Sequence, residues 1–243
     1  MNENRISDCD MCAIGGLRKR LPVVLASLKN SGYPGLVSII DDGSTDPEHL
    51  ACLEALAPVA SVVLRPKRGG IARAKNTALR ILQDSQVDLG FLAEDDIEFS
   101  PGWWDAYTEA HIATGIEHFS WAWDDDPSGE MEKVERLIRG FPVMDTSRVN
   151  GVFLTFTPTV LQVVGGFKIL PALWGHEHTQ WTRRIVHADL APFFADLPYS
   201  DRYVGLNSHA GFSAIPLEDR PQFDNENAPY AEILEPLFEP LIE

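Results

Sequence analysis

Three adjacent acidic residues, Glu94, Asp95 and Asp96, interrupt an apolar stretch in the segment FLAEDDIEFSPGWW. Neighbouring carboxylates repel one another and lose solvation beside a core, so a cation among them would lower the cost of placing them there. Carboxylate, water and phosphate oxygens are the ligands that Mg²⁺ and Mn²⁺ prefer. If the backbone stays extended, Glu94 and Asp96 point to the same side of it. The triplet therefore indicates either a divalent-metal site or a solvated acidic turn.

A second acidic group, Asp41 and Asp42, follows the β-branched run LVSII in the segment IIDDGSTD. Gly43 allows a tight turn there, and the Ser44 hydroxyl can hydrogen-bond neighbouring backbone groups. One interpretation is an Asx turn between a strand and a helix. The other is a carboxylate that accepts hydrogen bonds from a nucleotide base or ribose. The pattern by itself leaves both open.

A basic segment, RPKRGGIARAKNTALR, holds six of the 20 Lys and Arg residues of a chain whose net charge is −16. Gly69 and Gly70 precede a helix pattern, and glycines before a helix N-terminus offer N–H groups and close approach to a phosphate. Arg68 and Arg73 stand beside this glycine pair and are candidate phosphate contacts. A solvated helix face would account for Lys75.

The elements that must position these groups alternate along the first half of the chain. Strand-like runs at 11–16, 36–40 and 87–93 are separated by helix-patterned segments that include 47–57 and 71–85. Such alternation predicts an α/β fold with a mostly parallel central sheet flanked by helices. Ligands of such sheets lie beyond the carboxyl ends of the strands, where both acidic groups stand.

The composition limits the class of protein. No apolar run reaches about 18 residues, so we expect no transmembrane helix, and the N-terminus lacks a signal-peptide pattern, which favours the cytoplasm. The net charge of −16 argues against nucleic acid as a partner. Three cysteines are too few for a disulfide framework, and one CxxC pair is too few for a zinc site.

We expect one domain over residues 1–212 and an acidic, Pro-rich C-terminal extension over residues 213–243. The last segment, AEILEPLFEPLIE, mixes Leu and Ile with acids and prolines. It could pack on the domain or on a second copy of the chain, which leaves a homo-oligomer open.

At these motifs the chain resembles family 2 glycosyltransferases of the GT-A fold. IIDDGSTD, GGIARAKNTAL and FLAEDDIEFSPGWW, in this order, resemble the nucleotide-sugar-binding half of that family. VVGGF (163–167) and WGHEHTQWTRRI (174–185) resemble its acceptor-side segment and its acidic catalytic motif. The resemblance spans roughly residues 10–210. It implies a Rossmann-like nucleotide-diphospho-sugar transferase fold and inverting transfer of a sugar, most often from a UDP-sugar, to the hydroxyl of a glycan or another acceptor.

The resemblance also implies roles on the donor side. The nucleobase would lie at Asp41 and Asp42, and Lys75 would lie near the nucleotide. Glu94 and Asp96 match the two acids of the DxD motif, with Asp96 on Mn²⁺ or Mg²⁺ and Asp95 near the sugar and ribose. The expected donor-binding residues are Asp41, Asp42, Ser44, Arg68, Arg73, Lys75, Glu94 and Asp95. The expected metal ligands are Asp96, Glu94 and the late His209.

Catalysis would centre on Glu177 and His178. The family commonly has Glu-Asp there, with the Asp as base in inverting members, whereas this chain has His178 at the second position. The base could therefore be Glu177, His178, or His178 tuned by Glu177. On the acceptor or sugar side we expect Gly166, Trp174 and Trp104.

Two other functions compete with this interpretation. A nucleotidyltransferase would share the nucleotide-binding sheet and the metal acids but would not need the GGF and WGHEH segments. A catalytically degenerate sugar-nucleotide-binding protein would bind the donor without turning it over. We expect His111, His118 and His187 to be structural, and the acidic run at 124–126 to be a solvated loop.

Overall fold

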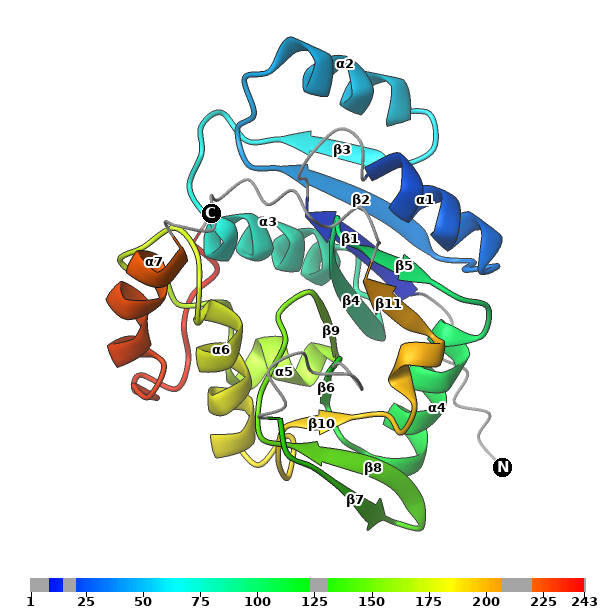
Figure 1. Cartoon of the computed structure of the whole chain (residues 1–243), viewed down its shortest axis with the longest axis vertical. Helices are drawn as coiled ribbons and strands as arrows, with labels where there is room; N and C mark the ends of the chain where they lie inside the picture. The colour runs from blue at the N-terminus through cyan, green and yellow to red at the C-terminus, as the bar shows by residue number, and fades with distance from the viewer. Residues whose placement is uncertain (1–8, 15–20, 123–130, 207–219, 243) are drawn as a thin grey trace.

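The computed structural model describes residues 9–14, 21–122, 131–206 and 220–242, and a six-stranded sheet runs through its centre (Figure 1). The strands are, in spatial order, β3 (Ser61–Leu64), β2 (Leu36–Asp41), β1 (Cys9–Ile14), β4 (Leu89–Glu94), β9 (Phe153–Phe156) and β6 (His118–Ser120). The first four are parallel, and β9 is antiparallel to both β4 and β6. The acidic groups at 41–42 and 94–96 therefore follow the carboxyl ends of parallel strands, as predicted.

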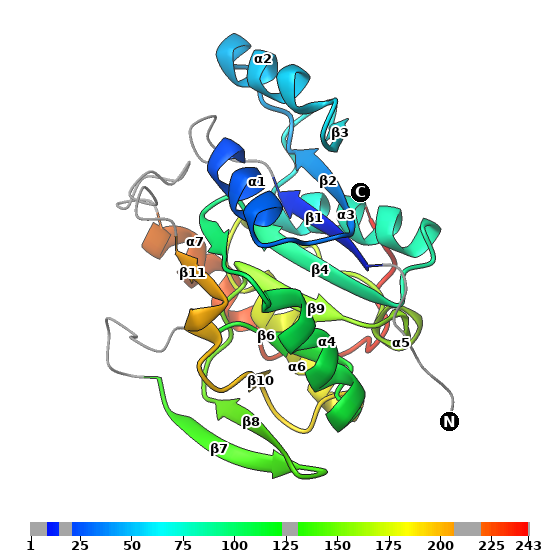
Figure 2. The ribbon, with the colours of Figure 1, turned by 90° about the vertical axis from the view of Figure 1, so that its right-hand side faces the viewer.

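Helices cover both faces of this sheet (Figure 2). One face carries α1 (Leu21–Asn30) and α4 (Trp103–Thr114), and Trp103 packs edge-on against Phe91 of β4 with ring centroids 4.9 Å apart. The other carries α3 (Ile71–Asp84), α5 (Pro158–Val163) and α6 (Glu177–His187), where Trp181 contacts Phe156 of β9 at 5.7 Å. Alternate side chains of a strand point to opposite faces, so both faces of the sheet are buried.

The expectation of a mostly parallel sheet is only partly right. It holds for β3-β2-β1-β4, whereas the strands that follow β4 in the chain pair antiparallel. β5 (Ile97–Phe99) pairs with β11 (Val204–Leu206), and β8 (Phe141–Thr146) lies between β7 (Lys133–Ile138) and β10 (Ala195–Asp196). The β7–β8 connection is a two-residue loop with positive φ at both Arg139 and Gly140, which favours a tight antiparallel hairpin.

The helix boundaries predicted from sequence hold closely. The segment predicted at 47–57 is α2 (Pro47–Leu56), which lies beside β3, and Asp46 caps it by accepting the Glu48 N–H at 3.1 Å. The segment predicted at 71–85 is α3, which contacts β1, β2 and β4. Among the described helices, none is long and apolar enough to cross a membrane.

The described part of the tail packs on the domain. After α7 (Arg220–Asn227) and a short turn of 3₁₀-helix at Ala228–Tyr230, the chain runs along α6 and reaches α3 (Figure 1). Glu239 forms a parallel bridge with Gly165, and Asn76 of α3 donates to the Ile242 carbonyl at 3.1 Å. The boundary expected at residue 212 falls in 207–219, outside the described residues, and stays a prediction.

Candidate functional site

The acidic triplet forms a turn held on both sides by strands. β4 ends at Glu94, whose N–H donates to the Val152 carbonyl at 2.8 Å, and β5 begins directly after Asp96. Asp95 is buried, whereas Glu94 and Asp96 are partly exposed. Because β5 pairs with β11, this turn is anchored to the sheet before it and to a small antiparallel ribbon after it. The three acids are therefore fixed at the carboxyl edge of the central sheet.

A buried lysine lies among these acids. Lys75 of α3 has no exposed surface, and its Nζ is 3.1 Å from Glu94 Oε1, 3.1 Å from Glu177 Oε1 and 3.1 Å from the Gly151 carbonyl oxygen. These three contacts match the three N–H donors of an ammonium group. The structure contradicts the alternative that Lys75 lies on a solvated helix face. It places the ammonium behind the acidic turn, where it joins β4 to α6.

The charges of this cluster shift one another's pKa values. Burial alone would raise the pKa of Glu177, but Lys75 and His178 lower it below the usual range of a glutamate. Burial would lower the pKa of Lys75, yet Glu177 and Glu94 raise it, so the ammonium stays charged. Burial, together with Asp96 and Glu177, raises the pKa of Glu94 against the opposing effect of Lys75. Lys75 and Glu177 therefore form a charged pair.

Glu177 and His178 begin α6 and differ in their access to solvent. His178 Nδ1 is 3.1 Å from Glu177 Oε1. The His178 side chain is 22% exposed, and the Glu177 side chain is 3% exposed. The other Glu177 oxygen, Oε2, is buried and has no hydrogen-bond partner among the described residues. A Cβ added at Gly151 would lie 2.6 Å from the His178 ring, so only glycine leaves room for this ring position.

The Asp41–Asp42 turn uses its carboxylates to hold the chain together. Asp41 is buried, accepts the Ser44 N–H at 2.8 Å and lies 3.1 Å from Nε2 of His49. Asp42 accepts the N–H groups of Gly69 at 3.0 Å and Gly70 at 2.8 Å. The tight turn between β2 and α2 expected from sequence is thus present, although the Asp41 carboxylate accepts the N–H three residues on, where an Asx turn would use the N–H two residues on. Its two carboxylates also tie β2 to α2 and to the N-terminus of α3.

The expectation that Gly69 and Gly70 offer free N–H groups to a phosphate is wrong for this structure. Both N–H groups donate to Asp42, whose carboxylate is also paired with Arg65. A negative side chain at a helix N-terminus is favourable because it meets unsatisfied N–H groups and the positive end of the helix dipole. Asp42 therefore occupies the place at the start of α3 that a phosphate would take.

The remaining residues expected on the donor side surround this turn. Arg68 is exposed, and Arg73 is half-buried on the first turn of α3 with its Cδ beside Gly69. α3 thus links the two acidic groups, since Asp42 meets its N-terminus and Lys75 follows about one turn later. His209 lies outside the described residues, as does the acidic run at 124–126.

The residues expected near the acceptor are not all brought together. Trp174 is half-buried, three residues before Glu177. Gly166 packs against α3, where an added Cβ would lie 2.5 Å from Asn76 Oδ1, so close packing accounts for this glycine. Trp104 lies on α4, on the opposite face of the sheet from α6, and packs against the core.

Sequence reasoning missed the loop before β9. The Gly151 carbonyl receives Lys75, and Asn150 Oδ1 accepts the Val152 N–H at 3.2 Å while its buried Nδ2 has no hydrogen-bond partner among the described residues. The dipeptide Asn-Gly before a strong strand pattern marks a turn. Lys75, which donates to the Gly151 carbonyl of this turn, is 76 residues earlier in the sequence. No local signal could therefore place this loop at the site.

The histidines expected to be structural behave as such where they are buried. His111 bonds the Ile116 carbonyl and Thr155 Oγ1, each at 2.7 Å, and burial lowers its pKa to about 3. His118 bonds the Thr155 carbonyl at 2.7 Å and Thr182 Oγ1 at 3.0 Å, and burial lowers its pKa to about 4. These neutral rings hold the core together. His187 is exposed at the end of α6.

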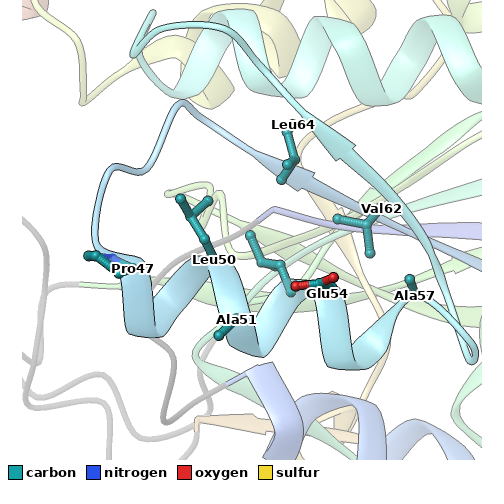
Figure 3. A pocket seen from close by; sticks show the side chains of 8 residues that line it. Pro47, Leu50, Ala51, Glu54, Ala57, Val62 and Leu64 are labelled. Carbon is teal, nitrogen blue, oxygen red and sulfur yellow. The ribbon is translucent and has the colours of Figure 1, made fainter.

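A hollow of about 550 Å³ opens elsewhere, between α2 and β3 (Figure 3). It is lined mainly by apolar side chains, including Leu50, Val62 and Leu64, and its one charged lining residue is Glu54. None of the residues expected to bind donor, metal or acceptor lines it. The chemistry-bearing residues lie instead at the carboxyl edge of the sheet.

Comparison by sequence finds a relative over most of the chain. The chain is 30% identical over 225 residues to the uncharacterized glycosyltransferase R363 of Acanthamoeba polyphaga mimivirus, and the match covers 87% of this chain and 86% of the viral protein. No protein-family model matches the chain.

Comparison by structure finds the same architecture in two solved proteins. S. aureus TarS, in complex with UDP-GlcNAc, matches with a TM-score of 0.57 and 13% identity over 85% of this chain and 60% of its own. GalNAc-T7, with UDP, GalNAc and Mn²⁺, matches with a TM-score of 0.55 and 12% identity over 74% of this chain and 40% of its own. The chain thus spans 60% and 40% of these two structures, and the likeness shows that it has a GT-A-like fold.

Proposed function

The chain belongs to the glycosyltransferases, and we propose that it moves a sugar from a UDP-sugar to an acceptor hydroxyl with the help of a divalent metal. One observation carries this proposal. The Glu94–Asp96 turn, at the end of a parallel strand, meets the Glu177–His178 pair at the start of α6 through the buried Lys75. A cluster that joins acids for a metal–diphosphate to a candidate base has the parts that glycosyl transfer needs.

The acidic turn suits a metal that also binds the donor. Mg²⁺ and Mn²⁺ are commonly held by one or two carboxylates and complete their coordination with water and substrate phosphates. No group of three or more His, Cys, Asp or Glu that could hold a metal is found in the described part of the chain, so the donor would supply further oxygens. We assign Asp96 as the main ligand, because Glu94 Oε1 is engaged by Lys75. His209 would complete the shell. When bound, the metal offsets the charge that builds on the leaving diphosphate.

The nucleoside is proposed to lie along the Asp41–Ser44 turn. Its support is that the two Asp carboxylates are already fixed by His49 and by the Gly69 and Gly70 N–H groups, so the turn is rigid before the donor arrives. Arg68 and Arg73 stand at the same end of α3 and would add positive charge near the diphosphate. Asp95, between the two metal acids, would face the sugar and ribose.

The acceptor is proposed to approach from the side of α6. Trp174 precedes the catalytic pair by three residues and could supply an apolar wall for a sugar ring. The Gly166 and Trp104 assignments keep only the support of the sequence motifs. A base on the far side of the sugar from the diphosphate would invert the anomeric centre, and NMR of the product anomer tests this.

Donor binding can be tested by thermal unfolding with UDP, with and without Mn²⁺. A ligand at about 100 times its Kd adds about 2.7 kcal/mol to the free energy of unfolding. We expect a Mn²⁺-dependent shift in the wild type, its loss in Asp96→Ala and its retention in Glu98→Ala, a half-exposed acid two residues further on. A shift with another nucleotide but not UDP would change the donor class, and no shift with any nucleotide would reject the proposal.

A further inference from the structure

We propose that His178 is the general base and that Glu177 is the positioning residue that orients it. This assignment rests on the proposed glycosyltransfer and names which member of the pair takes the acceptor proton. The two residues are adjacent at the start of α6 and in contact, with His178 Nδ1 3.1 Å from Glu177 Oε1.

Access separates the two candidates. A base must come within hydrogen-bond reach of the hydroxyl that it deprotonates. The Glu177 side chain is 3% exposed, and its Oε1 is already within 3.1 Å of both Lys75 Nζ and His178 Nδ1. The His178 side chain is 22% exposed. An acceptor can therefore reach the imidazole without displacing the buried ion pair.

The contact with Glu177 also fixes which imidazole nitrogen is available. An ionised carboxylate can only accept hydrogen bonds, so Nδ1 must carry the proton that it donates to Glu177 Oε1. Nε2 of a neutral imidazole then holds the lone pair that can accept a proton. The ring is held in place by its packing against Gly151, where no side chain would fit. Histidines oriented by a carboxylate in this way are a recurrent device of catalytic sites.

The surrounding charges support proton uptake at this position. The charged groups that face the pair are Lys75 of α3, which is 3.1 Å from Glu177, and Glu94 of β4, which is 3.1 Å from the same ammonium. Lys75 keeps Glu177 ionised, and the Glu177 carboxylate in turn stabilises the imidazolium that forms when His178 is protonated. Glu177 thus acts through His178 and does not touch the acceptor.

The proposed step conserves atoms and charge. The acceptor oxygen forms a bond to the anomeric carbon of the donor sugar while its proton moves to His178 Nε2. The bond between that carbon and the diphosphate oxygen breaks, and its electron pair leaves with UDP. The imidazolium then returns its proton to solvent. Water can replace the acceptor hydroxyl, which makes slow donor hydrolysis a usable assay.

The test measures UDP release from UDP-GlcNAc with Mn²⁺ across pH, with thermal shift by UDP–Mn²⁺ measured in parallel. We expect His178→Asn to slow release by about 10²–10⁴-fold, the usual contribution of a general base, while the thermal shift is unchanged. Glu177→Gln should slow release less. His187→Asn, at the exposed end of the same helix, should match the wild type.

His178→Asp separates a base from a structural residue. It should recover part of the rate lost in His178→Asn and move the acid limb of the pH profile to lower pH, because Asp carboxyls ordinarily titrate near about 3.9 and imidazoles near about 6.5. UDP release by His178→Asn at the wild-type rate, or a larger loss of rate in Glu177→Gln than in His178→Asn, would overturn the assignment of the base. Neither result would contradict donor binding. If UDP with Mn²⁺ does not raise the unfolding temperature of the wild type, the proposed glycosyltransfer itself is rejected.

Discussion

At the scale of single residues, the molecule depends on one buried ammonium. Lys75 lies between Glu94 and Glu177 and has no exposed surface. Removing one partner from a buried ion pair leaves an uncompensated charge, which costs more than the pair itself contributes. The acids of the site are therefore tolerated partly because the chain carries its own cation behind them.

Lys75→Met tests this dependence through stability. The methionine keeps the apolar stem but leaves the buried Glu177 and the partly exposed Glu94 without the ammonium, so we expect the free energy of unfolding to fall by about 3–5 kcal/mol. Urea denaturation at pH 7 measures the change. Arg80→Met, on the exposed face of the same helix, should change it by less than about 0.5 kcal/mol. Equal effects of the two variants would contradict the role assigned to Lys75.

Glu177 gives this network a defined dependence on pH. Burial alone would raise its pKa in the folded protein, but Lys75 and His178 together outweigh burial and bring the pKa below the usual value. The charge of such a group stabilises the fold fully above the unfolded pKa of about 4.3 and loses this effect as the pH falls toward the folded pKa. The stability difference between wild type and Glu177→Gln should thus be constant from pH 7 to about 5 and shrink below about 4. Urea titrations that show a constant difference down to pH 3 would refute this.

At the scale of elements, α3 organises the site. At its N-terminus the Asp42 carboxylate accepts the Gly69 and Gly70 N–H groups. About one turn later along the helix, Lys75 pairs with Glu94 of the second acidic group. The amide groups of Gly69 and Gly70 are thereby satisfied by a side chain from β2. The loop between β3 and α3 is consequently fixed to the end of β2.

Asp42→Ala should loosen this attachment. It leaves the Gly69 and Gly70 N–H groups and Arg65 without their carboxylate. Losing a side chain that accepts backbone N–H groups at the start of a helix typically costs about 0.5–2 kcal/mol. We expect a loss at the upper end of this range, measured by urea denaturation. Asp84→Ala, at the exposed last position of α3, is the control and should have almost no effect. A loss no larger than that of the control would show that this attachment contributes nothing to stability.

The sequence predicted these elements well and their contacts poorly. Strand ends, helix starts and both acidic turns follow from local patterns, because apolar periodicity and turn residues act within a few positions. The burial of Lys75 had a usable signal, since it lies on the apolar stripe that includes Ala72 and Leu79, three residues before and four residues after it. The filling of the α3 N-terminus by Asp42 had none, because residues 42 and 70 are adjacent only after folding.

At the scale of the whole molecule, the C-terminal tail completes the fold around α6. Arg184 is fully buried and donates to the Val164, Gly166 and Leu237 carbonyls at 2.8, 2.6 and 3.0 Å. The backbone carbonyl of Glu239 also accepts the Gly166 N–H at 2.8 Å, which attaches the tail to the loop before α6. The mixture of Leu and Ile with acids and prolines led us to expect the tail to pack on the domain or on a second copy of the chain. The individual contacts could not be predicted, because they join residues that are distant in sequence.

Arg184→Met tests whether the tail depends on this guanidinium. The Val164, Gly166 and Leu237 carbonyls would lose the guanidinium, and of these the Val164 carbonyl still accepts the Glu239 N–H at 3.0 Å. Each buried polar group left unsatisfied costs about 1–3 kcal/mol. We expect a loss of several kcal/mol in the free energy of unfolding and faster proteolysis of the segment after Tyr230. His187→Asn, at the exposed end of the same helix, should show neither effect. Unchanged proteolysis in Arg184→Met would mean that the tail is held by its other contacts.

We propose that Glu94, Asp96, Lys75 and the Glu177–His178 pair together form the glycosyltransferase centre for a UDP-linked sugar. The most direct measurement is UDP release from UDP-GlcNAc and other UDP-sugars in the presence of Mn²⁺, for wild type, Asp96→Ala and Glu98→Ala. We expect UDP release by wild type and Glu98→Ala with at least one donor, and none by Asp96→Ala. Release that is equal in all three proteins, or absent in all three with no stabilisation by UDP, would contradict it.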